Sequence, residues 1–133
     1  MAGTKVRNLS QTATIRASPM TVYETLVRAS EHAKFTGASA RLEAKVGGRF
    51  EHYDGSLSGV VVALDPGKRI VLAWRSSEWP EGHHSIADFT LRPVAGGTKV
   101  EFAQYGIPAS DFDDIADGWR TYYWRPLQAY LGT

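Results

Sequence analysis

The sequence predicts an α+β fold in which a curved antiparallel sheet of six or seven strands wraps around a long C-terminal helix, with two short helices after the first strand. Two observations predict it. Short β-rich runs between residues 41 and 105 alternate with glycine and proline, as they do in an antiparallel meander. A helical pattern rich in aromatic residues then closes the chain, and its apolar face needs a sheet to pack on.

The first strand and the two short helices are predicted in the first third of the chain. Val6–Ile15 mixes polar and β-favouring residues in the manner of a strand. Ser18 and Pro19 then place an N-cap side chain before a proline at the first helical position, where a missing N–H costs nothing. A second short helix is expected over Glu31–Phe35, with Ser30 as its cap.

The central segment predicts the remaining strands and their turns. Asp54-Gly55 is typical of a two-residue hairpin turn, and Asp65-Pro66-Gly67 and Gly96-Gly97 predict later turns. The expected strands are Arg49–Tyr53, Leu57–Leu64, Ile70–Arg75, His83–Arg92 and Thr98–Tyr105.

The last segment predicts the longest helix. Ser110 is expected to cap it, and the carboxylate of Asp113 lies near its start. Pro126 is expected to kink the helix, because its ring opposes the carbonyl of Tyr122 and it has no N–H to donate. The residues expected to face the sheet are Phe112, Ile115, Trp119, Tyr122, Tyr123, Leu127 and Tyr130.

Composition excludes several classes of function. The chain has 133 residues and no cysteine, which excludes thiol catalysis and cysteine-bound metal. The formal net charge is +1 without a basic run, so neither nucleic acid nor a membrane is an expected partner. No apolar stretch has the length of a membrane helix or follows the pattern of a signal peptide. We therefore expect a single cytoplasmic domain over residues 1–133.

Five peptides, in order along the chain, resemble one known family. They are Gly47-Gly48-Arg49-Phe50, Asp54-Gly55-Ser56-Leu57-Ser58-Gly59, Glu78-Trp79-Pro80-Glu81-Gly82-His83, Tyr105-Gly106-Ile107-Pro108-Ala109 and Gly118-Trp119-Arg120-Thr121-Tyr122-Tyr123. Over about residues 11–132 the chain is similar to the C-terminal domain of activators of the ninety-kilodalton heat-shock protein's ATPase, in the START-like (SRPBCC) superfamily. The resemblance implies a helix-grip fold and a possible heat-shock chaperone partner, and it implies no fixed catalytic set.

The aromatic residues predict a cavity between the sheet and the last helix. Four Trp, six Tyr and five Phe are many for a core of this size, and inward-facing rings could enclose a small apolar or amphipathic ligand. No cofactor and no metal ion is expected, because adjacent histidines on a strand point to opposite faces. The predicted lining of the cavity is Phe50, His52, Trp74, His84, Phe89, Phe102, Trp119 and Tyr123.

Two alternative functions remain open beside ligand binding. Trp79, Pro80 and Ile107 are expected in exposed loops that could dock on a chaperone's ATPase, which would make the chain a stress-related co-chaperone. A cavity enzyme of the cyclase or hydrolase type would use His84 or Asp88 as a general acid or base, although no catalytic motif is present. The chain is expected to be a monomer or a homodimer.

Overall fold

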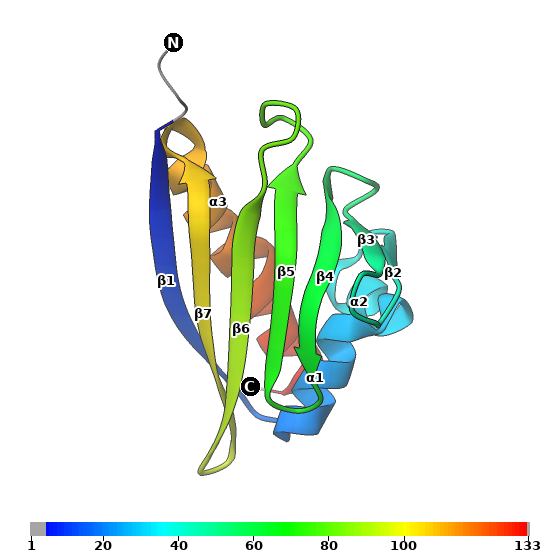
Figure 1. Ribbon diagram of the computed structural model, residues 1–133. Coiled ribbons are helices and arrows are strands. Elements are labelled where there is room, and N and C mark those ends of the chain that lie inside the picture. Colours follow the sequence, from blue (N-terminus) through cyan, green and yellow to red (C-terminus); the bar gives the residue numbers. More distant parts are fainter. Residues whose placement is uncertain (1–4, 133) are drawn as a thin grey trace.

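A computed structural model describes residues 5–132 of the protein. All strands belong to one antiparallel sheet with the order β1-β7-β6-β5-β4-β3-β2, and Figure 1 shows the helices gathered on one side of it. The predicted helix-grip fold is confirmed, with seven strands and two short helices after the first strand. The elements are β1 (Val6–Ile15), α1 (Pro19–Val27), α2 (Ala29–Thr36), β2 (Ala40–Leu42), β3 (Arg49–His52), β4 (Leu57–Asp65), β5 (Arg69–Ser76), β6 (Ser85–Val94), β7 (Gly97–Pro108), the 3-10 turn η1 (Ala109–Asp111), α3 (Phe112–Trp119), the π-helical turn η2 (Arg120–Trp124) and α4 (Arg125–Leu131).

The starts of the two short helices follow local sequence only in part. Ser18 caps α1 as predicted, since its side chain accepts a hydrogen bond from the backbone N–H of Thr21 at 3.3 Å. The second cap was predicted wrongly. Helix α2 begins at Ala29 after Arg28, which supplies no side-chain cap, so Ser30 lies inside the helix. Because α2 follows α1 without a loop, there is no room for a separate capping turn.

The β3–β4 hairpin is longer than its sequence suggests. His52 pairs with Leu57, which leaves four residues in the turn rather than the two predicted from Asp54-Gly55. Tyr53 and Asp54 both have left-handed backbones, with φ of 52° and 57°. The phenol of Tyr53 donates a hydrogen bond to the carbonyl oxygen of Tyr122 at 2.7 Å, so a long-range contact to the C-terminal helix accompanies this turn.

The same contact accounts for the irregular C-terminal helix. Pro126 has no N–H to donate to the carbonyl of Tyr122, four residues earlier, and that carbonyl instead accepts the bond from Tyr53. The turn that precedes the proline widens into the π-helical η2. The predicted disturbance at Pro126 is therefore confirmed, in the form of a widened turn.

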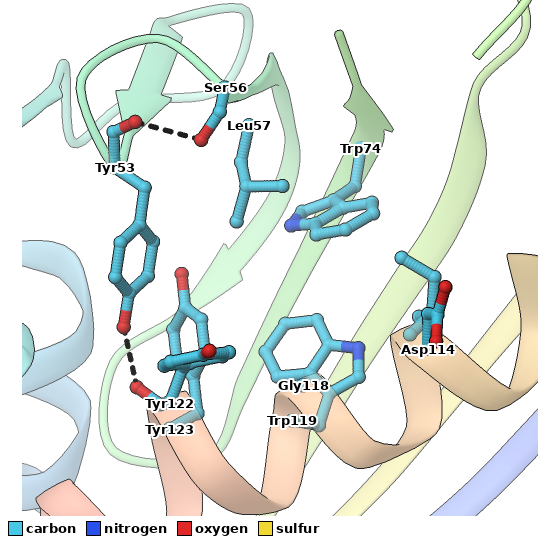
Figure 2. A pocket seen from close by; sticks show the side chains of 10 residues that line it. Tyr53, Ser56, Leu57, Trp74, Asp114, Gly118, Trp119, Tyr122 and Tyr123 are labelled. Carbon is cyan, nitrogen blue, oxygen red and sulfur yellow. Dashed lines mark hydrogen bonds between the residues drawn. The ribbon is translucent and has the colours of Figure 1, made fainter. Parts of the chain in front are cut away.

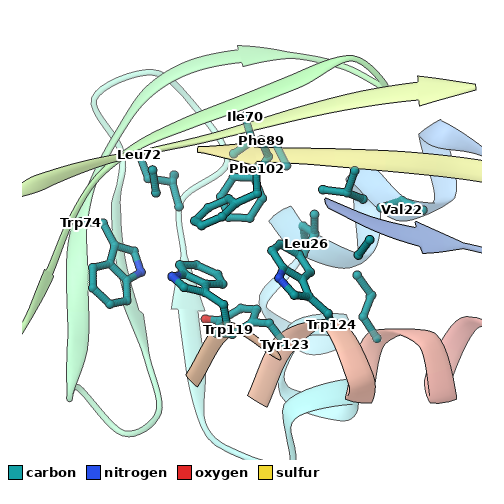
Figure 3. Close-up of a cluster of buried hydrophobic side chains, with 14 of the residues drawn as sticks. Val22, Leu26, Ile70, Leu72, Trp74, Phe89, Phe102, Trp119, Tyr123 and Trp124 are labelled. Carbon is teal, nitrogen blue, oxygen red and sulfur yellow. The ribbon is translucent and has the colours of Figure 1, made fainter. Parts of the chain in front are cut away.

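The widened turn changes which side chains face the sheet. Tyr123 and Trp124 are both buried, at 4% exposure, whereas Tyr122 is 58% exposed and Tyr130 is 40% exposed. A π-helical turn contains an extra residue, which rotates the following residues about the helix axis. The regular helical stripe predicted for Tyr122 and Tyr130 was therefore wrong, and Trp124 takes a core position in Figure 3.

Buried amide groups anchor the C-terminal helix to the sheet. The indole of Trp119 donates to Gln104 at 2.8 Å, and Gln104 donates in turn to Ser85 at 2.8 Å. On β1, Gln11 accepts from the indole of Trp124 at 2.7 Å and donates to the carbonyl of Ala116 on α3 at 2.9 Å. These bonds satisfy polar groups that would otherwise be costly to bury, and they fix the position of the helix on the sheet.

Candidate functional site

The space directly beneath the C-terminal helix is filled by the protein's own side chains. Phe50, Phe89 and Phe102 are at most 3% exposed, and Figure 3 shows Phe89 and Phe102 packed among the tryptophans. A void of only about 10 Å³ remains there. It is lined by Leu26, His32, Leu42, His52, Ile70, Leu72, Trp74, Phe89, Trp119 and Tyr123.

An open pocket lies at one end of this core, between the β3–β4 turn, β5 and α3. Its volume is about 280 Å³, and its lining is mainly apolar. Of the predicted cavity residues, Trp74, Trp119 and Tyr123 line it, and these three also line the small void behind it. Figure 2 shows the pocket, which is lined by Tyr53, Ser56, Leu57, Trp74, Asp114, Ile115, Gly118, Trp119, Tyr122 and Tyr123.

Tyr53 and Gly118, which the sequence analysis did not select, help to shape this pocket. Tyr53 forms one wall, held against the helix by its hydrogen bond to Tyr122 (Figure 2). Gly118 lies within α3, and a Cβ atom built on it would meet no neighbour nearer than the Tyr122 ring at 3.9 Å. The missing side chain therefore leaves open space at the pocket. A glycine inside a predicted helix was the available sequence signal, because such a glycine usually has a packing or functional reason.

The Trp74 indole at the pocket has no hydrogen-bond partner among the described residues 5–132. Trp74 is 3% exposed, and its Nε1 atom is buried. The other three indoles each donate a hydrogen bond: Trp79 to Asp111, Trp119 to Gln104 and Trp124 to Gln11. A buried donor without a partner costs about 1–3 kcal/mol, so the Trp74 N–H is an unusual feature of this core.

Two buried histidines stack at the inner void. The rings of His32 and His52 lie 3.7 Å apart between centroids, and the Tyr123 hydroxyl lies 3.1 Å from Nδ1 of His52. Burial lowers the pKa of His32 to about 4, and burial together with the adjacent His32 holds the pKa of His52 well below its usual value. Both rings are therefore neutral near pH 7. In the part of the chain that the structure describes, both nitrogens of His32 and Nε2 of His52 have no hydrogen-bond partner.

The remaining candidate for the cavity, His84, lies elsewhere. It is exposed in the loop before β6, and its Nδ1 atom lies 3.1 Å from the carbonyl oxygen of Gly82. The structure thus separates His84 from His52. Asp88 pairs with Arg69 across the sheet at 2.6 Å. Within residues 5–132, no group of three or more histidine, aspartate or glutamate side chains could hold a metal ion.

Two of the three residues expected in exposed docking loops are buried. Trp79 is 5% exposed, packs edge-on against Trp74 at 5.4 Å between ring centroids, and donates its indole N–H to Asp111 at 2.7 Å. The predicted cap, Ser110, lies inside η1, so Asp111 stands at the N-cap of α3, and the Asp111 carboxylate accepts from Trp79 and does not cap the helix. Ile107 is 0% exposed, and only Pro80 lies at the surface. The expectation of exposed Trp79 and Ile107 was therefore wrong.

The sheet carries an apolar row on the face that points away from the helices. Val60 lies opposite Ala73, Ala73 opposite Ile86, and Ile86 opposite Tyr105, so the row crosses β4, β5, β6 and β7 in register. Val60 is 38% exposed, Ile86 39% and Tyr105 48%. Side chains alternate between the faces of a sheet, and this row falls on the side that Figure 1 shows without helices. We call these four residues the outer row.

Comparison with known proteins decides the family. A family model described as "Activator of Hsp90 ATPase homolog 1-like protein" matches residues 16–132. The chain belongs to this family. The predicted resemblance is thereby confirmed.

Curated relatives agree with the family match. The chain is 35% identical over 119 residues to the human "Activator of 90 kDa heat shock protein ATPase homolog 1", covering 90% of this chain and 35% of the relative. It is 35% identical over 109 residues to the Dictyostelium discoideum "Activator of 90 kDa heat shock protein ATPase homolog", covering 79% of this chain and 28% of the relative. The chain thus spans about a third of the length of these relatives.

Solved structures show the same fold. An HSP90 activator from Plasmodium falciparum superimposes with a TM-score of 0.87 at 21% identity, over 97% of this chain and 96% of that one. CalU16 from Micromonospora echinospora superimposes with a TM-score of 0.80 at 17% identity, over 95% of this chain and 76% of that one. No helix in the described part of the chain is long and apolar enough to cross a membrane.

Proposed function

We propose that this chain binds a ninety-kilodalton heat-shock chaperone through the outer face of its sheet and modulates the chaperone's ATPase. Membership of the activator family supports the choice of partner. The exposed outer row is the observation that carries the choice of surface. Apolar side chains that are adjacent and exposed on one face commonly mark a protein-binding site, whereas scattered ones do not.

The outer row has the composition of a small protein interface. Val60 and Ile86 offer aliphatic surface, Ala73 between them lets a partner approach the backbone, and Tyr105 supplies an aromatic ring with a polar end. Aromatic residues are frequent energetic anchors of interfaces. Arg69 on β5 and Asp88 on β6 form an ion pair on two of the strands that carry the outer row. This pair provides the polar rim that such a surface needs.

A substitution in the outer row tests the proposal. Ile86→Glu places a carboxylate in the centre of the row, and the fold should tolerate it because Ile86 is already 39% exposed. Thr14→Glu is the matched control, since Thr14 is exposed on β1 and pairs with Lys99, which can accommodate the new charge. Binding to the purified chaperone is measured by calorimetry, and ATP turnover is measured at saturating concentrations of this chain.

The wild type and Thr14→Glu should bind the chaperone and change its turnover rate. Ile86→Glu should bind at least tenfold more weakly, because a tenfold change in affinity corresponds to about 1.4 kcal/mol and the loss of an interface anchor commonly costs that much or more. An unchanged turnover rate with wild-type protein at saturation would overturn the ATPase proposal. Equal binding by Ile86→Glu and wild type would overturn the surface.

A second candidate function is the binding of a small apolar or amphipathic molecule. The pocket of about 280 Å³ beside Gly118 favours it, because the pocket is concave, mainly apolar and lined by several aromatic rings. Native mass spectrometry of freshly purified protein tests it, with the denatured protein as reference. A co-purified small molecule that Gly118→Leu fails to retain would support this function, and identical retention by both proteins would contradict the pocket.

A further inference from the structure

We propose that the pocket beside Gly118 takes an uncharged bicyclic aromatic molecule that carries a hydrogen-bond acceptor, and that the indole N–H of Trp74 donates to this acceptor. The inference rests on the small-molecule function proposed above and names the chemical class of its ligand. Size, charge and hydrogen bonding each contribute one part of the argument.

The size and shape of the pocket fit a small flat molecule. Its volume of about 280 Å³ is slightly below the roughly 300–1,000 Å³ of pockets for drug-sized ligands, so a smaller molecule fits it. The rings of Tyr53, Trp119 and Tyr122 stand around it in Figure 2, and they offer faces and edges against which an aromatic ligand can stack. The open space at Gly118 lets a ring approach the helix backbone closely.

The lining of the pocket disfavours a charged ligand. Asp114 is the one ionisable acid on the lining, and no lysine or arginine contributes to it. An anion would therefore meet a carboxylate with no compensating cation. A cation would meet the carboxylate of Asp114, but Asp114 is exposed, and an ion pair in water contributes too little to offset the transfer of the cation to a mainly apolar surface. An uncharged ligand is therefore the class that fits this lining best.

The unpaired Trp74 donor selects the polar group of the ligand. Figure 2 shows the indole nitrogen on the side of the ring toward Leu57 and Tyr123, and the atom is buried beneath these side chains, so an acceptor reaches it when they move apart. Because Nε1 is buried and has no partner within residues 5–132, an acceptor that inserts among these rings would gain a hydrogen bond without first breaking one. The remaining indoles are already paired and offer no such gain.

Two probes that differ in one hydroxyl test the inference. 2-Naphthol has an acceptor oxygen and naphthalene has none, and calorimetry compares their affinities for the wild type, for Trp74→Phe and for Trp124→Phe. The last variant is the matched control, because it removes an indole N–H that already bonds to Gln11 and does not line the pocket. We expect the wild type and Trp124→Phe to prefer 2-naphthol about 3- to 10-fold, the usual worth of one hydrogen bond, and Trp74→Phe to lose that preference.

The outcomes separate the inference from the function on which it rests. Equal binding of both probes by the wild type, or a preference retained in Trp74→Phe, would overturn the role of Trp74 while small-molecule binding stands. Failure of both probes to bind would overturn both proposals. Gly118→Leu should abolish binding of both probes, because the new side chain occupies the pocket.

A second measurement covers the case in which Trp74→Phe does not fold. In proton–nitrogen NMR spectra of the wild type, 2-naphthol should move one tryptophan indole signal downfield, as expected for a new hydrogen bond. Naphthalene should not produce this downfield shift. Spectra in which no indole signal responds to 2-naphthol would overturn the inference.

Discussion

Gly118 provides a direct test of the pocket geometry, because replacement by alanine should stabilise the protein. Glycine inside a helix is less stable than alanine by roughly 0.5–1 kcal/mol, since its backbone loses more conformational freedom on folding. A Cβ at Gly118 would meet only the Tyr122 ring, at 3.9 Å, which is ordinary van der Waals contact. We therefore expect Gly118→Ala to raise the free energy of unfolding by about 0.5–1 kcal/mol.

Urea denaturation monitored by tryptophan fluorescence measures this change. Gly37→Ala is the matched control, because a Cβ there would also meet no close neighbour, with nothing within 4 Å, but φ is +73°. Alanine is strained in that conformation, so Gly37→Ala should lower the free energy of unfolding by about 1 kcal/mol. If Gly118→Ala destabilised the protein as much as Gly37→Ala does, the pocket would not have the open space described.

Three further predictions concern polar groups that hold the helices on the sheet or lie in the core. Because the pKa values of His32 and His52 are lowered in the folded state, the unfolded chain binds protons more readily, and the wild type should lose about 1.4 kcal/mol of stability per pH unit per histidine as pH falls from 6.5 toward about 4. The exposed control His84→Ala should show the same loss, and the variant with leucine at both positions 32 and 52 should not. Identical pH profiles of all three proteins in acid denaturation would contradict this. Tyr53→Phe should lower the free energy of unfolding by about 1 kcal/mol through its lost bond to η2, measured in urea, whereas an unchanged midpoint would show that the bond contributes nothing. Gln104→Leu should cost about 1–3 kcal/mol because it leaves the buried Trp119 indole without its acceptor, while the Ser85 hydroxyl keeps its bond to the carbonyl of Trp74; a thermal midpoint equal to that of the wild type would refute the anchoring role.

The fold was predictable because its signals are local. The first strand was expected over Val6–Ile15 and has those bounds in the structure. Ser18 and Pro19 start a helix because a capping hydroxyl and a fixed φ act within one turn. Period-two alternation and glycine-rich turns likewise identify an antiparallel meander without any knowledge of distant contacts.

The details that were predicted wrongly depend on contacts between distant residues. Ser110 lies inside the 3-10 turn η1 and Asp111 stands at the N-cap of α3, where its carboxylate bonds to an indole 32 positions away that sequence proximity cannot reveal. The π-helical turn brings Trp124 into the core, and it occurs where Pro126 and the distant Tyr53 act on the same carbonyl. The periodicity of apolar residues along one segment cannot predict an arrangement that depends on a distant residue.

The candidate site was predicted in part for the same reason. Trp74, Trp119 and Tyr123 were selected as inward-facing aromatics, and all three line the pocket. Whether a cavity remains between such rings depends on how completely they fill the space, and that is a property of the packed core. The stack of His32 on His52 was not predictable, because it joins a helix to a strand that is distant in the sequence. The spacing of His32 and Phe35 on one helix face was the available sequence signal that His32 is buried.

The most direct test of the central proposal, chaperone binding through the outer row, is an NMR titration of isotope-labelled protein with unlabelled ninety-kilodalton heat-shock chaperone. We predict that the backbone amide signals of Val60, Ala73, Ile86 and Tyr105 broaden or shift first, while those of α1 and α2 on the opposite side of the sheet change least. Changes confined to the helices, or spectra that stay the same at excess chaperone, would contradict the account.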